Sequence, residues 1–507
     1  MKNAVSKGLA LVLAAGMVMS TALVAGAEEG YKDTIIWAQG ADVTSLDPHQ
    51  GKETPAVEVT CQIFDTLFVV NAETGELENQ ICESYEQKDE ITYVFKIRQG
   101  IKFHDGTELT AEDVKFSLDR AIASAAVSYV CDFIDTVTIV DDYTVEVVLD
   151  APYAPALRNL AVPFTAIIPK AAVEADEEAF ILNPIGSGPY KFVEWNQGDS
   201  VKLEAFDEYY AGAPATKNLI MKVVPEAAQR TIALETGEID IAYDILPNDL
   251  DKVRENADLQ LFEAPSLTCY YVSLNMNKAP LDDVRVRTAI NLAIDREAIV
   301  DAIAYGAGQA ADCIIAPAVY GYASPGTYEY DPEKAAALLE EAGYGDGFDI
   351  TLWVNDNQSR IEACQAIQGM LMEIGINCEI EVMEFGTFIE KTTNGEHDMG
   401  YFGWVTSTRD ADYTYYSLEH SSQQGAAGNR TFIADPEVDA LVEAGRTSTD
   451  PAVREQAYAD LAAKLFEINN NAPIYYSNIT AGASAKVEGF VMDPIGYHDL
   501  QNVKVAE

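Results

Sequence analysis

Alternating apolar positions predict antiparallel β-structure in the N-terminal half of the chain. Residues 93–97 alternate apolar and polar side chains, Gly100 interrupts the run, and residues 101–103 resume it. This pattern predicts a strand, a turn and a second strand. Apolar residues also alternate over 137–149, on either side of two aspartates, which predicts a β-hairpin. A helix capped by Thr110 is expected between the two, so we expect an α+β half with antiparallel pairs.

Helical periodicity is clearer in the second half. Asp331 as N-cap, Pro332 in the first turn and Gly343 after the last turn form a complete helix signature. The same reasoning predicts helices after Asp282 or Asp283, from Asp295 to Gly306 and over 363–374, with strands over 350–354 and 376–382. Because helices and strands alternate here, we expect an α/β lobe.

The first 27 residues have the pattern of a secretory signal peptide. Lys2 and Lys7 form a basic start, residues 9–19 are apolar, and the small residues before Glu28 suit signal peptidase, with cleavage after Ala27. A membrane anchor is the less favoured alternative, because the apolar stretch is barely long enough to span a bilayer. The position of a lipid-modified cysteine holds Ala27, so we predict no lipobox and a free protein in the periplasm, cell envelope or extracellular space.

Composition and charge narrow the possible partners. The 507 residues include 82 acidic and 33 basic side chains, which gives a net charge of −49. A protein with so few basic groups cannot readily neutralise phosphates, so we exclude nucleic acid as a partner. With 48% apolar residues the chain can bury a large core, and its length predicts two to four domains. The sequence leaves the reason for the acidity open.

Cysteine and histidine usage indicates neither a metal site nor a cofactor. The five histidines are scattered along the chain and form no cluster with cysteine. The seven cysteines are odd in number, and most lie in apolar contexts typical of buried thiols. Disulfide pairing stays open at this point. The cysteines are Cys61, Cys82, Cys131, Cys269, Cys313, Cys364 and Cys378.

Several runs of residues carry a more specific signal. The first are Ile63-Phe64-Asp65-Thr66-Leu67, residues 91–98, Gly100-Ile101-Lys102-Phe103-His104-Asp105-Gly106-Thr107 and residues 109–114, and the series continues over 186–192, 237–240, 286–296, 342–344 and Gly403-Trp404. In this order they resemble the bacterial extracellular solute-binding proteins of family 5, the peptide, nickel and glutathione binders of ABC importers. The resemblance covers essentially the whole chain after the signal peptide.

The resemblance implies an α/β, two-lobed periplasmic-binding-protein-like fold with mixed sheets, of type II and of the large cluster with an extra insert subdomain. Mapped by motif, the parts are lobe I over 28–264 with the insert at about 59–183, lobe II over 265–477, and a C-terminal return to lobe I over 478–507. The crossings between lobes would be 266–273 and 473–480, two strand-like stretches that would form a hinge for closure on ligand.

The loop after the Gly-Trp pair bears on the solute. In peptide binders of this family an aspartate three residues after the Trp pairs with the α-ammonium of the ligand, and here that position holds Ser407. A neutral hydroxyl does not replace a buried ion pair. The run over 407–412 is instead similar to the Ser-Thr-Gly-Asp-Ala-Asp stretch of the glutathione-binding branch, with Arg409 in place of the glycine.

The candidate ligand-binding residues follow from this resemblance, each with a structural alternative. Trp404 is a ligand platform or part of the lobe core. Arg409 and Asp410 are ligand contacts or a solvated loop pair, and Arg360 holds a ligand carboxylate or is a surface arginine. The loop over 42–48 resembles the cleft-lining loop of the family. The full set is Thr44, Ser45, Arg360, Trp404, Thr406, Ser407, Arg409 and Asp410.

The expected function is capture of a short peptide or glutathione-like solute between two lobes and its delivery to an ABC importer. Its partners would be membrane permease subunits with cytoplasmic ATPases, and the protein would be a monomer and not an enzyme. A nickel chelate, a sugar or an opine is the alternative solute. A secreted hydrolase lacks the Gly-x-Ser-x-Gly motif, since residues 186–188 read Gly-Ser-Gly. A sensor or adhesin is an alternative that the sequence cannot separate from transport.

Overall fold

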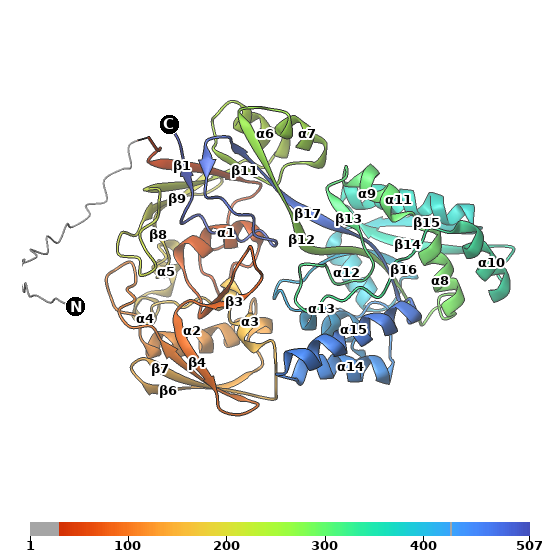
Figure 1. Cartoon of the computed structure of the whole chain (residues 1–507), viewed down its shortest axis with the longest axis horizontal. Coiled ribbons are helices and arrows are strands. Elements are labelled where there is room, and N and C mark those ends of the chain that lie inside the picture. Colours follow the sequence, from red (N-terminus) through yellow and green to blue (C-terminus); the bar gives the residue numbers. More distant parts are fainter. Residues whose placement is uncertain (1–29, 426–427) are drawn as a thin grey trace, which may run out of the picture.

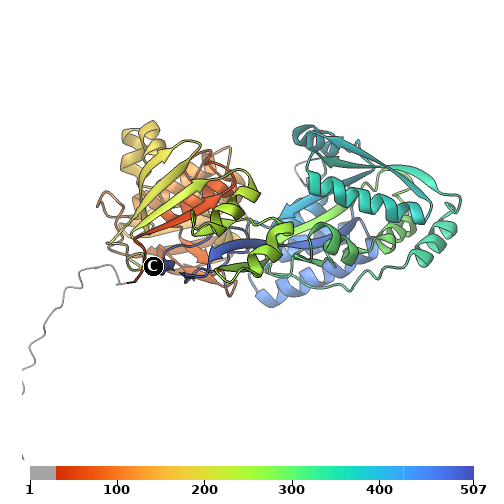
Figure 2. The ribbon, with the colours of Figure 1, turned by 90° about the horizontal axis from the view of Figure 1, so that it is seen from above.

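Two lobes lie side by side and share two long strands. The computed structural model describes residues 30–425 and 428–507, so the predicted signal peptide over 1–27 and its cleavage after Ala27 lie outside the described residues. Figures 1 and 2 show β12 (Leu259–Leu274) and β17 (Asn471–Ser484) running from one body into the other. We call the body that contains the first strand, β1 (Thr34–Gln39), lobe I and the other lobe II.

The two shared strands have the form of a hinge. They pair antiparallel over almost their full length, and the register shifts between Pro265 and Cys269. Pro265 has no N–H to donate, which weakens the ladder at this point. The expected crossings over 266–273 and 473–480 fall within these strands. The numerical boundaries of the lobes stay a prediction.

One sheet continues through both lobes. Its strand order is β15-β14-β16-β12-β17-β11-β1-β10-β9-β8, and β13 pairs with β17 outside this path. β1 pairs in parallel with both β10 and β11, while β9 pairs antiparallel with β10 and β8, so this sheet is mixed, as the resemblance implies. The insert lies between β1 and β10 in sequence and provides the long connection that parallel neighbours need. The remaining strands are β8 (Tyr190–Asn196), β9 (Ser200–Ala205), β10 (Asn218–Val223), β11 (Ile241–Tyr243), β13 (Gly308–Ala310), β14 (Phe348–Asn355), β15 (Ile376–Met383) and β16 (Met399–Val405).

The insert of lobe I has an antiparallel sheet of its own, with the order β4-β5-β7-β6. Helix α2 (Ala111–Ala123) packs on β6 and β7 and begins with the expected capping box of Thr110 and Asp113. The predicted strand over 101–103 was wrong, because these residues enter a loop in which Phe103 N donates to Thr107 O over 2.8 Å. The strands are β4 (Cys82–Gln87), β5 (Thr92–Ile97), β6 (Ile134–Asp141) and β7 (Thr144–Leu149).

Lobe II places most of its helices around β14, β15 and β16. Helix α10 has the predicted ends, since Asp331 Oδ1 accepts from Lys334 N over 2.9 Å and Gly343 adopts a left-handed φ of 91°. Helix α9 stops before Gly306, because Tyr305 and Gly306 both have positive φ. The helices are α8 (Val284–Ala293), α9 (Arg296–Ile303), α10 (Pro332–Ala342), α11 (Gln358–Glu373), α12 (Phe385–Thr393), α13 (Ala411–Glu419), α14 (Pro436–Thr447) and α15 (Pro451–Ile468).

Short elements complete the fold. The helices are α1 (Thr54–Ile63), α3 (Ala156–Asn159), α4 (Lys170–Ala175), α5 (Glu177–Leu182), α6 (Ala227–Glu235) and α7 (Leu250–Arg254), the 3₁₀ turns are Ser128–Val130, Pro163–Thr165, Pro247–Asp249 and Ser421–Gln423, and the strands are β2 (Phe68–Val70), β3 (Leu77–Asn79), β18 (Val487–Glu488) and β19 (Lys504–Val505). All seven cysteines are unpaired, and all except the half-buried Cys61 are buried, as expected. Within residues 30–425 and 428–507, none of the helices combines the length and apolar character needed to cross a membrane.

Candidate functional site

An open cavity of about 400 Å³ lies between the lobes. Lobe I supplies most of its wall, from the insert and from the C-terminal segment, and lobe II supplies the loop after β16. This volume is in the range of small-molecule sites. The lining residues are Cys61, Phe64, Asp65, Thr66, Val69, Val70, Asn71, Ala72, Glu73, Glu78, Gln80, Arg158, Ala161, Val162, Pro163, Pro189, Tyr209, Ser407, Thr408, Arg409, Gly489, Val491, Asp493, Ile495, Tyr497, His498, Asp499, Gln501 and Asn502.

The loop between β16 and α13 carries the contribution of lobe II. Ser407, Thr408 and Arg409 line the cavity, and Arg409 has a left-handed φ of 59°. That conformation costs a residue with a side chain about 1–2 kcal/mol and costs glycine little. The glycine expected at this position in the glutathione-binding branch therefore suits the turn, and the arginine is retained here against a backbone penalty.

An ion pair between lobes offsets this penalty. Arg409 Nη2 lies 2.6 Å from Asp493 Oδ2, and both side chains are largely buried. Asp493 belongs to the C-terminal segment, where its other carboxylate oxygen accepts from two backbone N–H groups. Since Asp493 occupies the Arg409 guanidinium, a solute would have to compete with it for this cation.

Asp410 lies behind the cavity wall. Its Oδ1 accepts from Arg454 Nη2 over 2.7 Å and from Asp412 N over 3.0 Å, so this carboxylate caps α13 and pairs inside lobe II. Thr406 is also buried, with its hydroxyl 2.8 Å from Thr414 Oγ1. Both residues position the loop, and neither lines the cavity.

Trp404 forms an aromatic contact beside the cavity. Its Nε1 donates to Thr414 Oγ1 over 3.0 Å, and its ring stacks on Tyr413 with 5.3 Å between centroids. The Tyr413 ring in turn lies 6.3 Å from the ring of Tyr129 in lobe I. The half-buried indole therefore belongs to a row of rings that reaches across the lobes.

Arg360 lies in the first turn of α11 and does not line the cavity. Its Nη1 donates to Asn355 Oδ1 over 2.9 Å, and its guanidinium lies over the ring of Tyr270. Within the part of the chain that the structure describes, no carboxylate lies within 4.0 Å of it. Gly403 allows this arrangement, because a Cβ at that position would lie 3.0 Å from Arg360 Nη2.

The predicted loop over 42–48 does not reach the cavity lining. Thr44 is exposed and donates to Glu53 Oε2 over 2.7 Å, while Ser45 Oγ accepts from Asp47 N over 3.1 Å. Of the eight predicted ligand contacts, the structure thus brings only Ser407 and Arg409 to the cavity. Ligand binding by all eight stays a prediction.

Sequence reasoning missed most of the polar residues of the lining, among them Asp65, Arg158 and Thr408. Asp65 lies within a run that carried the family resemblance, yet it was not named as a site residue. It is buried, and this raises its pKa to about 8 while hydrogen bonds from tyrosine hydroxyls oppose the rise. Arg158 has no spacing pattern that would single it out, and Thr408 lies in the run over 407–412 but was not named as a site residue.

Contacts around the cavity hold the lobes together. Ala154 N donates to Arg446 O over 2.8 Å, and the guanidinium of Arg158 lies 5.0 Å from the ring centroid of Tyr320. In each pair one residue comes from the insert and the other from lobe II. The cavity therefore lies between two bodies that also touch each other directly.

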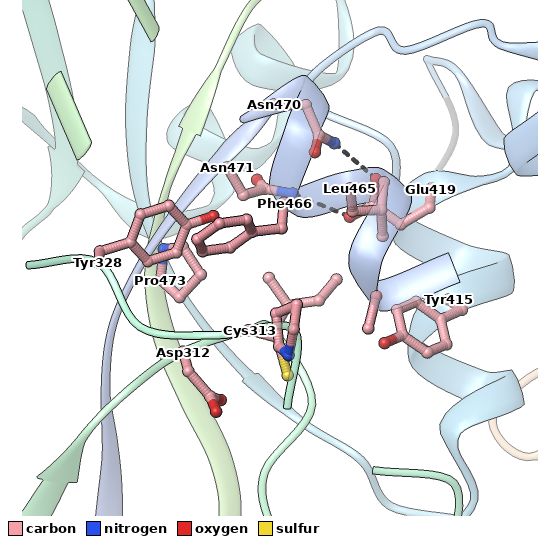
Figure 3. A pocket seen from close by; sticks show the side chains of 13 residues that line it. Asp312, Cys313, Tyr328, Tyr415, Glu419, Leu465, Phe466, Asn470, Asn471 and Pro473 are labelled. Carbon is pink, nitrogen blue, oxygen red and sulfur yellow. Dashed lines mark hydrogen bonds between the residues drawn. The ribbon is translucent and has the colours of Figure 1, made fainter. Parts of the chain in front are cut away.

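A second, much smaller cavity lies inside lobe II (Figure 3). Its volume of about 20 Å³ accommodates roughly one water molecule. Glu419 points into this region and accepts from Asn470 Nδ2 over 2.6 Å and from Asn471 Nδ2 over 2.9 Å. Burial raises the pKa of Glu419 to about 8. This space is too small for a solute.

The described residues hold no group of three His, Cys, Asp or Glu side chains placed to bind a metal ion. His498 lines the larger cavity, but its ring nitrogen Nδ1 lies 2.9 Å from Glu58 Oε1 and both side chains are fully buried. His498 Nε2 has no hydrogen-bond partner among the described residues, so the lining offers a nickel ion at most this one imidazole.

Comparisons with a family model and with curated relatives both identify solute-binding proteins. Residues 76–426 match the model for the middle part of the bacterial extracellular solute-binding proteins, family 5. The glutathione-binding protein GsiB of Pectobacterium atrosepticum is 32% identical over 512 residues, which cover 98% of each chain. The dipeptide-binding protein of Escherichia coli K12 is 30% identical over 477 residues, or 87% of this chain and 89% of the relative.

A solved structure shows the same architecture. HbpA2 from Haemophilus parasuis superposes with a TM-score of 0.87 at 27% identity, covering 94% of this chain and 100% of HbpA2. Likeness at this level extends over both lobes and the strands that join them.

Proposed function

The chain belongs to the bacterial extracellular solute-binding proteins of family 5, and on that premise we propose that it captures a short peptide or a glutathione-like solute for an ABC importer. Members of the family are binding proteins that act outside the cytoplasm with ABC permeases. The solute named here comes from the relatives, which include a glutathione-binding and a dipeptide-binding protein.

The observation that carries the proposal is the cavity between the lobes. A solute in it would contact the insert, the C-terminal segment and the loop at Ser407 together. Since these walls belong to two bodies joined by β12 and β17, such a solute makes its full set of contacts only when the lobes are together. It would therefore shift the population toward the closed form, which a permease can recognise.

The character of the lining favours a small polar solute. Hydroxyl, amide, carboxyl and guanidinium groups alternate with short apolar side chains, and a volume of about 400 Å³ suits a di- or tripeptide. A nickel chelate is supported less, because the lining holds a single histidine and that side chain is fully buried. Sugars and opines remain alternatives for the screen.

Export and partners complete the proposal. The segment over 1–27 would direct the chain through the cytoplasmic membrane, and Ala27 in place of a cysteine would leave the mature protein without a lipid. We propose that the mature monomer delivers its solute to membrane permease subunits driven by cytoplasmic ATPases, without chemical turnover of the solute.

A thermal-shift screen of the protein from Glu28 onward tests this function. The solutes are di- to pentapeptides, glutathione, nickel-histidine, sugars and opines. A bound solute at 100 times its Kd should stabilise the protein by about 2.7 kcal/mol. Ser407→Trp fills the cavity and should abolish the shift, while Ser422→Trp, at an exposed position, should keep it. A shift that survives in Ser407→Trp would place the solute elsewhere, and no shift with any solute would refute the proposal.

A further inference from the structure

One arginine of the cavity wall has no acidic partner. Arg158 closes the short helix α3, and its Nη2 donates to Gly75 O over 3.1 Å. Among the described residues no carboxylate lies within 4.0 Å of its guanidinium, although the chain has 82 acidic residues. The exposed Glu73 and Glu78 line the same cavity and still leave this cation unpaired.

The neighbouring arginines are all neutralised. Arg454 pairs with Asp410 and Arg409 pairs with Asp493. Burial lowers the pKa of Arg158, Asp410 opposes this, and the positive charges of Arg454 and Arg409 lower it further. Arg158 is therefore the one arginine of these three without a carboxylate in contact, although the cavity lining also includes Asp65, Glu73, Glu78 and Asp499.

A buried hydroxyl of the opposite lobe lines the same cavity without a partner. Thr408 is 3% exposed, and its Oγ1 has no hydrogen-bond partner within the described residues. A buried hydroxyl left without a partner costs about 1–3 kcal/mol, so such groups are usually satisfied. A solute atom that accepts a hydrogen bond would satisfy it.

We propose that Arg158 and Thr408 form a subsite for a carboxylate of the solute. This inference rests on the proposed function and deepens it, because it names an acidic solute as the preferred class. The carboxylate accepts from the guanidinium of lobe I and from the hydroxyl of lobe II. Both bonds are made only when the lobes are together, so the acidic group contributes to closure as well as to affinity.

A purely structural role for Arg158 makes a different prediction. Its guanidinium and that of Arg454 lie on the ring of Tyr320, at 5.0 and 4.9 Å from the centroid, so Arg158 also joins the lobes directly. If this were its only role, loss of Arg158 would weaken the binding of acidic and neutral solutes equally. Tyr320→Leu removes only the contact between the lobes, since it takes away the ring and keeps the Arg158 guanidinium.

Calorimetric titration with matched probes separates the two roles. The probes are Ala-Leu and glutathione, each as the free acid and as the C-terminal amide. In the unaltered protein the acid should bind at least 10-fold more tightly than the amide. In Arg158→Gln the preference for the acid should fall below about threefold, and in Thr408→Val it should fall in part. Tyr320→Leu should lower the affinity for acid and amide alike and leave the preference unchanged.

Arg98 supplies the matched control. It is a half-buried arginine of the insert that donates to Gln80 O over 3.3 Å and lies over the ring of Tyr210, but it does not line the cavity. Arg98→Gln should keep the full preference for the acid. An unchanged preference in Arg158→Gln, or equal binding of acid and amide by the unaltered protein, would overturn the subsite.

A carboxylate probe that is not a peptide tests the subsite if no peptide binds. If no peptide binds any variant, the peptide form of the proposed function fails, and succinate then serves as the carboxylate in a thermal-shift titration. A shift in the unaltered protein and in Arg98→Gln that is lost in Arg158→Gln would support the subsite. Equal shifts in all three proteins, or no shift in any of them, would overturn it.

Discussion

The guanidinium carbon of Arg446, in lobe II, lies 4.7 Å from the ring centroid of Tyr153, in the insert of lobe I. Asp412 Oδ2 accepts from Arg446 Nη1 over 2.8 Å and so holds the arginine in this position. Neither Arg446 nor Tyr153 lines the cavity. One side chain therefore joins the lobes at a place that the solute does not touch.

Arg446→Ala should lower the affinity for every solute by a similar factor. Loss of this contact destabilises the form in which the lobes touch and leaves the cavity lining intact, so the affinity falls with the population of that form. We expect a rise in Kd of about 5- to 20-fold, the same for acidic and neutral solutes, in calorimetric titration. Arg254→Ala removes an exposed arginine of lobe I and should leave Kd unchanged. A loss confined to one class of solute would contradict this assignment.

Glu419 should make the protein less stable as the pH rises. The pKa of about 8 in the folded protein lies above the value of 4.5 for an ordinary glutamate. The folded state therefore holds a proton that the unfolded chain releases, and the free energy of unfolding falls between about pH 4.5 and 8 by up to about 1.4 kcal/mol per pH unit from this group. Urea unfolding over this range measures the slope.

Glu419→Gln should make that slope shallower, because the amide stays neutral at every pH and only the other buried carboxyl groups, such as Asp65, still contribute. Its baseline stability should fall by about 1 kcal/mol, since the amide cannot accept from both Asn470 and Asn471 as the carboxyl group does. Glu333→Gln, at an exposed position of α10, should leave the slope as it is. An equal slope in Glu419→Gln and the unaltered protein would show that Glu419 ionises normally.

Gly403→Ala should destabilise the protein through a steric conflict. A Cβ at this position would lie 2.8 Å from Tyr270 Cε1 and 3.0 Å from Arg360 Nη2, so both side chains would have to move. We expect a loss of about 1–3 kcal/mol in chemical unfolding. Gly369→Ala is the matched change, because Gly369 lies in α11 with open space around it and should gain about 0.5–1 kcal/mol. Similar effects of the two changes would contradict the close packing over Gly403.

Ser407→Asp should shift the preference toward solutes with a free amino group. The new carboxylate would face the cavity in the position where the family resemblance expects an aspartate for an α-ammonium. Calorimetry with Ala-Leu and N-acetyl-Ala-Leu should show a preference for the free amine that is about 5- to 10-fold larger than in the unaltered protein. Ser407→Asn adds similar bulk without charge and should not change the preference. An equal effect of Asn and Asp would rule out charge as the cause.

Local sequence signals predicted the regular elements well. The N-cap of α10 at Asp331 and the capping box of Thr110 are short-range features, in which a side chain satisfies a backbone N–H three residues away, and Gly343 ends α10 through its own left-handed φ. The early end of α9 was missed, because nothing in its apolar pattern indicates the positive φ of Tyr305. The parallel pairing of β1 with β10 was missed as well, since the partner lies beyond the insert.

The candidate site depended on contacts between distant parts of the chain. Ser407 and Arg409 could be predicted from the motif that precedes them, but the pairing of Arg409 with Asp493 spans 84 residues and has no local signal. The burial of Asp410 against Arg454 likewise follows from the packing of α13 and α15. Arg158 reaches the cavity only because the insert folds against lobe II.

Small-angle X-ray scattering with and without a solute tests the central claim most directly. If the solute binds between the lobes and holds them together, its addition at saturation should lower the radius of gyration of the unaltered protein. Arg446→Ala should be more extended without solute and should reach the same compact form at a higher concentration. Saturating binding that leaves the radius of gyration unchanged in both proteins would contradict capture by lobe closure.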